Sequence, residues 1–231
     1  MTNDLPQGSA KWDALHPYAS LTPDAVLDAL ADIGLMGDGR LIALSSYENR
    51  VYQIQLETER APAQTDGTPV PESVVAKFYR PGRWTDAQIQ EEHDFAAELV
   101  AAEVPVVPPL NLQGRTLHHK SFVKGVNSSA AHKANLAEPQ KTVQGFSFSV
   151  SERRGGRRPE LDDDEVLEWI GRFLARIHTV GAAKAFHNRP SLSIDTFMQE
   201  PKEWLLHNKA IPIEVERAWQ DTWQQAMDVM H

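Results

Sequence analysis

The sequence predicts an α+β protein in which a small sheet domain precedes a helical one. Strand-like segments are confined to the first 150 residues, whereas every apolar pattern after about residue 165 has helical spacing. A polar, Gly-containing linker separates the two parts. The length of 231 residues fits one large domain or two small ones.

The composition excludes several classes of function. The chain has 23 Lys and Arg residues against 32 Asp and Glu, a net charge of −9, which argues against broad electrostatic binding of nucleic acid. It contains no cysteine, so disulfides, thiolate zinc sites and a cysteine nucleophile are excluded. The N-terminal residues do not have the pattern of a signal peptide, and no apolar run is long enough to cross a membrane. We therefore expect a soluble, cytoplasmic protein that binds no membrane.

The first half of the chain alternates helices and strands. Thr22 and Pro23 begin a helix as its N-cap and first residue, and Gly34 ends it. Thr85 and Gln88 have the spacing of a capping box and begin a second helix, which stops before a group of prolines. Strands are expected at residues 40–44, 51–56 and 73–79, with a loop at 61–72.

After the second helix the pattern changes from strand to helix. Residues 110–117 predict a hairpin, and alternating apolar residues at 146–150 predict a short strand. Between them, residues 118–144 are polar without clear periodicity, so we expect an insertion or flexible loop. Residues 151–165 predict a linker that carries four arginines and then a run of acids. Helical spacing begins at Val166, and a last helix is expected at 213–230.

Lys77 is the first candidate for chemistry. Strand alternation places it with Val75 and Tyr79 on one face of the strand at 73–79, opposite three apolar residues. An ammonium group in such a strand must either reach water or meet an anion. Two interpretations are open: an edge-strand lysine that faces solvent, or a lysine with a functional partner.

Glu92 is the candidate partner of Lys77. It lies three residues after Ile89 and three before Phe95, so it shares the inward stripe of the second helix. A strand lysine and a glutamate on the next helix form the pair that protein kinases use to hold nucleotide phosphates. The alternative is that Glu92 lies at the helix surface, as its neighbour Glu91 is expected to do, and the pattern does not decide which of the two acids meets Lys77.

Residues 45–50 join two expected strands and suggest a second element of such a site. Their backbone N–H groups could cover a phosphate, and Ser45 and Ser46 are small enough to permit its approach. The segment contains no glycine, so an ordinary polar hairpin is the alternative interpretation.

The histidines do not predict a metal site. His118 and His119 are adjacent in the sequence and therefore point apart, and no pair of histidines has the spacing of a zinc-binding helix. His178 follows an apolar stripe and is expected to be a core or capping residue. The arginines between 153 and 158 are expected to form a solvated linker paired with nearby acids.

Taken together, these segments resemble a known family, the bacterial stress-response serine/threonine kinases within the aminoglycoside-phosphotransferase-like, or choline-kinase-like, phosphotransferases. The similarity covers nearly the whole chain except residues 118–144. The segments that carry it are SYENRVY at 46–52, VAKFYRP at 75–81, EEH at 91–93, VPV at 104–106, GFSF at 145–148, GRFLARIH at 171–178 and EPK at 200–202.

The resemblance implies a bilobal, protein-kinase-like fold with ATP and Mg²⁺ as cofactors and a protein hydroxyl as phosphate acceptor. Residues 1–150 would form a complete antiparallel-sheet lobe that binds ATP, 151–165 a hinge, and 166–231 the start of an incomplete helical lobe. Lys77 would bind the ATP phosphates and Glu92 would hold Lys77. The nucleotide loop would comprise Ser46, Tyr47, Glu48 and Asn49, and the hinge beside adenine would include Ser151 and Glu152.

The chain departs from the family pattern in one respect. The family's catalytic loop, H-G-D-x-H-x-x-N, and its later metal-binding D-x-D segment are absent from these residues. We expect the catalytic Asp and the Mg²⁺ ligands to lie beyond His231, so that the chain alone would be inactive. Two alternatives stay open, a non-catalytic nucleotide-binding module of the truncated-pseudokinase type and a small-molecule kinase of the same fold. The sequence does not predict the oligomeric state.

Overall fold

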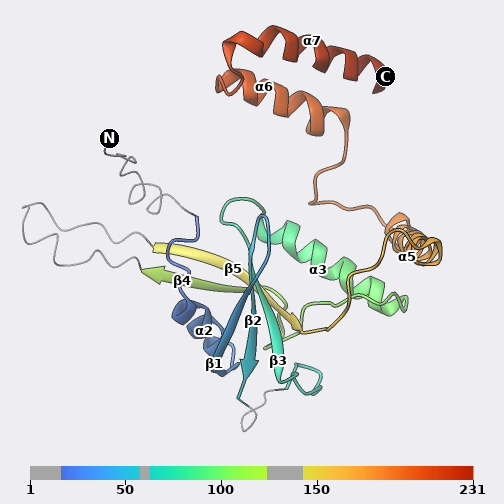
Figure 1. Ribbon diagram of the computed structural model, residues 1–231. Helices are drawn as coiled ribbons and strands as arrows, with labels where there is room; N and C mark the ends of the chain where they lie inside the picture. The colour runs from blue at the N-terminus through green and yellow to red at the C-terminus, as the bar shows by residue number, and fades with distance from the viewer. Residues whose placement is uncertain (1–16, 58–62, 124–142, 231) are drawn as a thin grey trace, which may run out of the picture. The chain divides into compact units, whose positions relative to one another are not determined.

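The computed structural model describes residues 17–57, 63–123 and 143–230 (Figure 1). The chain divides into two compact units, Met1–His187 and Asn188–His231. Among these described residues, the first unit contains a sheet and three helices, and the second contains helices only. The expected order of a sheet part followed by a helical part is thus present, while the boundaries proposed for a lobe, a hinge and a second lobe stay predictions.

The sheet of the first unit has five strands in the order β1-β2-β3-β5-β4. Each pair of neighbours is antiparallel. The strands are β1 Gly37–Leu44, β2 Arg50–Leu56, β3 Ser73–Phe78, β4 His118–Val123 and β5 Val143–Glu152. Strand β3 is therefore the middle strand, paired with β2 on one side and with β5 on the other.

One face of the sheet packs against helix α2, Pro23–Asp32, and the main hydrophobic core lies between them. On β3 the alternation is strict, because Val74, Ala76 and Phe78 are all 0% exposed. The Phe78 ring stacks on Phe148 of β5 with ring centroids 5.1 Å apart. The opposite face of β3 carries Lys77, and helix α3, Asp86–Ala101, lies against it.

The predicted helix starts are confirmed. The Thr22 hydroxyl accepts a hydrogen bond from the Ala25 amide at 3.2 Å, with Pro23 at the first helical position. The capping box at α3 is complete, since the Thr85 hydroxyl accepts from the Gln88 amide and the Gln88 side chain accepts from the Thr85 amide. Gly34 ends the first helical segment with a left-handed φ of 85°.

Helix α5, Asp164–Ala182, is attached to α3 at its polar edge. The Arg176 guanidinium donates to the carbonyls of Ala102 and Glu103, at 3.2 and 2.7 Å. Lys184, just beyond the helix, pairs with Glu98 at 2.9 Å. No residue of α5 is buried by the described part of the chain, and its apolar side chains Leu167, Trp169 and Leu174 are exposed.

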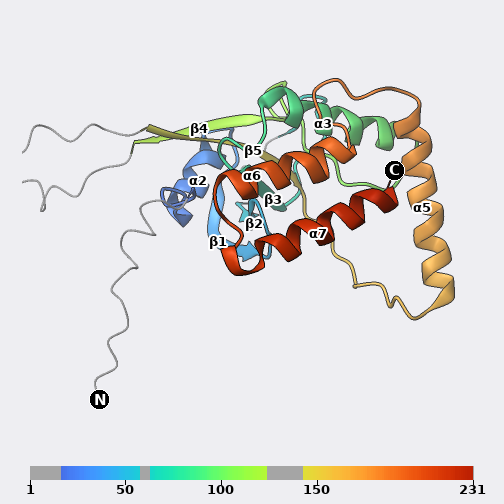
Figure 2. The same cartoon turned by 90° about the horizontal axis from the view of Figure 1, so that it is seen from above.

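The second unit contains a short π-helical segment, Asp195–Gln199, which continues into α6, Glu200–His207, and then α7, Ile213–Met230. Helices α6 and α7 lie side by side (Figure 2). They contact each other through Lys202, whose ammonium lies 3.5 Å from the centroid of the Trp223 ring. None of the described helices in either unit is both long enough and apolar enough to span a bilayer.

The structure corrects the interpretation of residues 118–144 as a loop. His118–Val123 is strand β4 and Val143 begins β5, while 124–142 lie outside the described residues. Strand β4 is polar because it is the edge of the sheet, so its sequence lacks the apolar alternation of an inner strand. The expected hairpin at 110–117 is a tight turn with a single bridge between Leu112 and Arg115.

Two smaller expectations also change. Ser151 and Glu152 are the last residues of β5 rather than part of a linker, and residues 153–163 contain no helix or strand. His178, expected in the core or at a helix cap, is exposed on α5.

Candidate functional site

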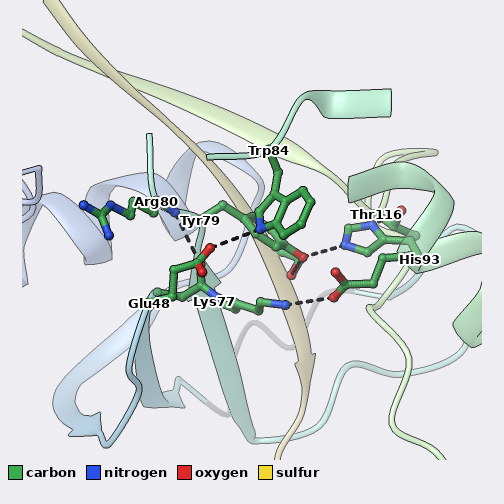
Figure 3. A network of polar contacts seen from close by, with 10 residues as sticks. Glu48, Lys77, Tyr79, Arg80, Trp84, His93 and Thr116 are labelled. Atoms are coloured by element: carbon green, nitrogen blue, oxygen red, sulfur yellow. Dashed lines mark hydrogen bonds and ion pairs between the residues drawn. The ribbon is translucent and has the colours of Figure 1, made fainter. Parts of the chain in front are cut away.

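Lys77 and Glu92 form an ion pair between the middle strand and helix α3. The Lys77 Nζ lies 2.8 Å from Glu92 Oε1, and the two side chains are 32% and 36% exposed (Figure 3). Because β3 has a neighbour on each side, the interpretation of Lys77 as an edge-strand lysine is wrong. The structure brings together the two residues that the strand and helix patterns placed on facing surfaces.

Glu91 has a different partner. Its Oε1 accepts a hydrogen bond from the backbone amide of His187 at 2.6 Å. Adjacent residues of a helix point about 100° apart, so α3 directs Glu92 toward the sheet and Glu91 toward the segment that follows α5. Glu92, and not Glu91, is therefore the partner of Lys77, which the sequence alone did not decide.

The Lys77–Glu92 pair contributes little to the stability of the fold. Pairs that are about one third exposed are screened by water, and measured contributions are typically about 0–1 kcal/mol. The pair instead fixes the position of an ammonium group that water, and hence a ligand, can still reach. Such an ammonium suits a phosphate group, which is a compact anion.

A buried polar network lies beside this pair, and sequence reasoning missed it. The Tyr79 hydroxyl is 2.8 Å from His93 Nε2 and 3.2 Å from the Ser149 hydroxyl. His93 Nδ1 is in turn 2.9 Å from the Thr116 hydroxyl (Figure 3). The Lys77 ammonium lies over the Tyr79 ring, 4.6 Å from its centroid. The available signal was that Tyr79 shares a strand face with Lys77 and that His93 follows Glu92.

Burial controls the protonation of this network. It lowers the pKa of His93 below 6.5, an effect to which Lys77 adds and which Glu92 and Asp94 oppose. Burial also raises the pKa of Tyr79 above 10, and Lys77 opposes that shift. Both groups are therefore uncharged near neutral pH.

The loop between β1 and β2 lies at the end of the sheet that carries Lys77, because Val51 pairs with both Leu44 and Lys77. Tyr47 at its tip is fully exposed. The Glu48 carboxylate accepts a hydrogen bond from the Trp84 indole at 3.1 Å, and the Tyr18 hydroxyl donates to the Glu48 carbonyl at 2.8 Å. The first contact holds the loop against the turn that follows β3, and the second holds it against the segment before α2.

The remaining loop and hinge candidates lie on either side of β3. Ser46 is partly exposed, and the Asn49 side-chain oxygen accepts from the Arg80 amide at 3.3 Å. Ser151 pairs with Val75 in the sheet, two residues along β5 from Ser149, which lies opposite Lys77. Glu152 forms an ion pair with Arg154 at 2.7 Å.

The histidines of the sheet edge have protein partners. His119 Nε2 lies 3.4 Å from Asp86 Oδ2, and the His118 ring packs against Phe148 with centroids 5.5 Å apart. Within residues 17–57, 63–123 and 143–230, no three His, Asp or Glu side chains gather as metal ligands.

Comparison with known proteins identifies the family of the chain. Residues 40–230 match the model of the phosphotransferase enzyme family. The chain is 36% identical over 202 residues to stress response kinase A of Escherichia coli K12, which covers 87% of this chain and 51% of that protein. It is 37% identical over 191 residues to serine/threonine protein kinase RdoA of Salmonella typhimurium, covering 83% and 48% of the two chains.

A solved structure supports the fold. The amicoumacin kinase hAmiN, determined with AMP-PNP, Ca²⁺ and Ami, superposes with a TM-score of 0.50 at 15% identity, covering 93% of this chain and 56% of that one. The chain spans about half the length of the curated relatives it matches. The α+β architecture of the aminoglycoside-phosphotransferase-like proteins, expected from the sequence, is confirmed. This chain belongs to the phosphotransferase enzyme family.

Proposed function

We propose that the sheet unit binds the phosphates of ATP through Lys77, and that the protein in its complete form transfers the γ-phosphate of ATP to a serine or threonine hydroxyl of a protein. The observation that carries the proposal is the 2.8 Å ion pair between Lys77 on the middle strand and Glu92 on α3. The ammonium is fixed by protein contacts and is still partly exposed, which are the two properties that phosphate binding needs.

The other candidate residues have proposed roles around Lys77. Ser46, Tyr47, Glu48 and Asn49 would cover the phosphates from the β1–β2 loop, mainly through backbone amides. Ser151 and Glu152, at the end of β5, would lie beside the adenine. Mg²⁺ is proposed to accompany ATP, but the described residues contain no cluster suited to hold it, and we assign it no ligand.

The proposed acceptor is a protein hydroxyl because the two curated relatives, 36% and 37% identical, are named as a stress response kinase and a serine/threonine protein kinase. The likeness to a kinase of amicoumacin concerns the fold alone, and it makes a small-molecule acceptor the alternative. A nucleotide-binding module without phosphate transfer is the third candidate.

Nucleotide titration of the chain tests the role of Lys77. Lys77→Met should weaken ATP binding by about tenfold or more, because it removes a charge-assisted contact to phosphate. Lys184→Met is the matched control, since Lys184 also pairs with an α3 glutamate, at 2.9 Å, but lies next to α5. Equal affinities of Lys77→Met and the unaltered chain would contradict the proposal.

A second measurement separates the three candidate functions. The protein is purified from its own cells, so that any residues that follow His231 are included. It is incubated with Mg²⁺ and γ-labelled ATP, together with either a bacterial protein extract or a set of small aminated alcohols, and the label is located by mass spectrometry. Label on serine or threonine supports the protein kinase, and label on a small molecule supports the alternative. Tight ATP binding with no labelled product supports the non-catalytic module.

A further inference from the structure

We propose that Tyr79 and His93 are positioning residues of the nucleotide site: their hydrogen bond holds the Lys77 ammonium where the ATP phosphates bind. This inference rests on the proposed role of Lys77. Neither residue would touch ATP, since Tyr79 is 3% and His93 is 4% exposed. They would act through the side chain of Lys77 and through the attachment of α3 to β3.

The geometry contains two parallel links between the middle strand and α3. Lys77 and Tyr79 are two residues apart and share one strand face, while Glu92 and His93 are adjacent on the helix. The ion pair and the tyrosine–histidine hydrogen bond both measure 2.8 Å. Two links prevent α3 from rotating about either one, so the place of Glu92 depends on the link made by His93.

Tyr79 also contacts Lys77 directly. The ammonium lies 4.6 Å from the centroid of the Tyr79 ring, within the range of a cation–π interaction. A lysine has four rotatable bonds, and a single partner at Nζ leaves several of its conformations open. The aromatic face adds a second restraint on the same ammonium, so the ring orientation of Tyr79 matters for where Lys77 points.

The ring orientation is in turn fixed by a chain of hydrogen bonds. The Tyr79 hydroxyl meets both His93 and Ser149, and the far nitrogen of His93 meets Thr116. The Gln90 amide donates to the same Thr116 hydroxyl at 3.3 Å. A neutral imidazole offers one donor and one acceptor, which two hydroxyls satisfy completely in either tautomer. Residues of α3, β5 and the turn before β4 therefore all take part in the hydrogen bonds that fix the orientation of Tyr79.

The site favours a neutral imidazole, because a protonated one would be a second, buried cation beside Lys77. The charged and titratable groups around the His93 ring are Glu92 and Asp94 on α3, Lys77 and Tyr79 from β3 and its end, and His118 on β4. Burial outweighs the two carboxylates and lowers the pKa of His93. Acid should therefore disturb the position of Lys77 through His93.

The first test is Tyr79→Phe, which removes the hydroxyl and keeps the ring. ATP binding should weaken by about threefold to tenfold, less than in Lys77→Met, because the ammonium is retained but less well placed. Tyr52→Phe is the matched control, since Tyr52 lies on the neighbouring strand, opposite Ala76, and packs against Phe78. Thermal unfolding of each variant checks that the fold is intact. Affinity equal to that of the unaltered chain would overturn the proposal.

A double variant distinguishes positioning from a general structural role. In the Lys77→Met background, Tyr79→Phe should have no further effect on ATP affinity, because the group that it positions is gone. A further loss equal to that of the single variant would overturn the proposal. If Lys77→Met alone leaves affinity unchanged, the proposed function itself fails, so the two failures give different results.

The His93 series gives an independent readout. His93→Leu should weaken ATP binding about as much as Tyr79→Phe, and His93→Gln should recover part of the loss, because its amide can still meet the Tyr79 hydroxyl. As pH falls below 6.5, the affinity of the unaltered chain should drop more steeply than that of His93→Gln, since protonation of ATP affects both alike. Parallel pH profiles, or no recovery in His93→Gln, would contradict the assignment.

Discussion

The two faces of strand β3 have different roles. On one face Val74, Ala76 and Phe78 are completely buried against α2 and the aromatic rings of β5. On the other side Lys77, and Tyr79 directly after the strand, make polar contacts to side chains of α3 and β5. The comparison shows that consecutive residues can serve stability and positioning separately, because successive side chains of a strand point to opposite sides.

The largest expected effect is on the apolar face. Phe78→Ala removes a fully buried ring that stacks on Phe148 and contacts Phe146 edge-on, so the free energy of unfolding should fall by about 3–5 kcal/mol. Denaturant titration measures the change. Val75→Ala, on the opposite face and partly exposed, is the control and should cost clearly less. Equal losses from the two variants would break the distinction between the faces.

Acid should act on His118, a buried histidine on the apolar face of the sheet. His118 is 6% exposed, its Nε2 has no hydrogen-bond partner among the described residues, and burial lowers its pKa to about 4. The unfolded chain then binds more protons than the folded one below pH 6.5, so stability is full above that pH and falls toward pH 4. The shift from 6.5 to about 4 corresponds to at most about 3 kcal/mol.

Unfolding titrations at several pH values, with His118→Leu alongside, check this expectation. The variant should lose much of the dependence between pH 6.5 and 4, and what is left should include His93, whose pKa is also lowered by burial. A variant with the same pH profile as the unaltered chain would assign the acid sensitivity to other groups.

The next effect concerns the attachment of α3. Thr85→Ala removes the hydroxyl that accepts from the Gln88 amide, and the expected cost is about 1 kcal/mol. Thermal unfolding measures it, and Thr85→Ser, which keeps the hydroxyl, is the control. A loss as large as that of Phe78→Ala would mean that the start of α3 contributes as much to stability as the apolar core.

The smallest change in stability is expected where the change in ligand binding is largest. Lys77→Met breaks a partly exposed ion pair, so the free energy of unfolding should change by less than about 1 kcal/mol. Differential scanning calorimetry without nucleotide is the measurement. A loss of several kcal/mol would show that the polar face also supports the fold, and it would make reduced ATP binding by this variant uninformative.

Much of this arrangement could be predicted from local patterns. Strict alternation placed Lys77 opposite three apolar residues, and three-residue spacing placed Glu92 on the inward stripe of its helix. Thr85 and Gln88 identified the start of α3, because a capping box involves only residues within one turn. These features depend on neighbours in the chain, and the sequence displays them directly.

What could not be predicted depends on distant partners. Ser149 meets Tyr79 from 70 residues away, and Thr116 meets His93 from 23 residues away. The residues that neighbour Ser149 and Thr116 in the sequence give no indication of these contacts. Strand β4 was missed for a related reason, since an edge strand pairs on one side only and its polar sequence resembles that of a loop.

The order of the strands has a consequence for how the protein folds. Strands β1, β2 and β3 follow one another and pair as a local meander, whereas Lys77 of β3 lies opposite Ser149 of β5 across a long stretch of chain. Bringing the two ends of such a stretch together lowers the conformational entropy of the chain before stabilising contacts form. Strand β5 should therefore dock after the meander has formed. The Tyr79–Ser149 contact would then be among the last to form during synthesis and refolding. Pulsed hydrogen exchange should find β2 protected before β5.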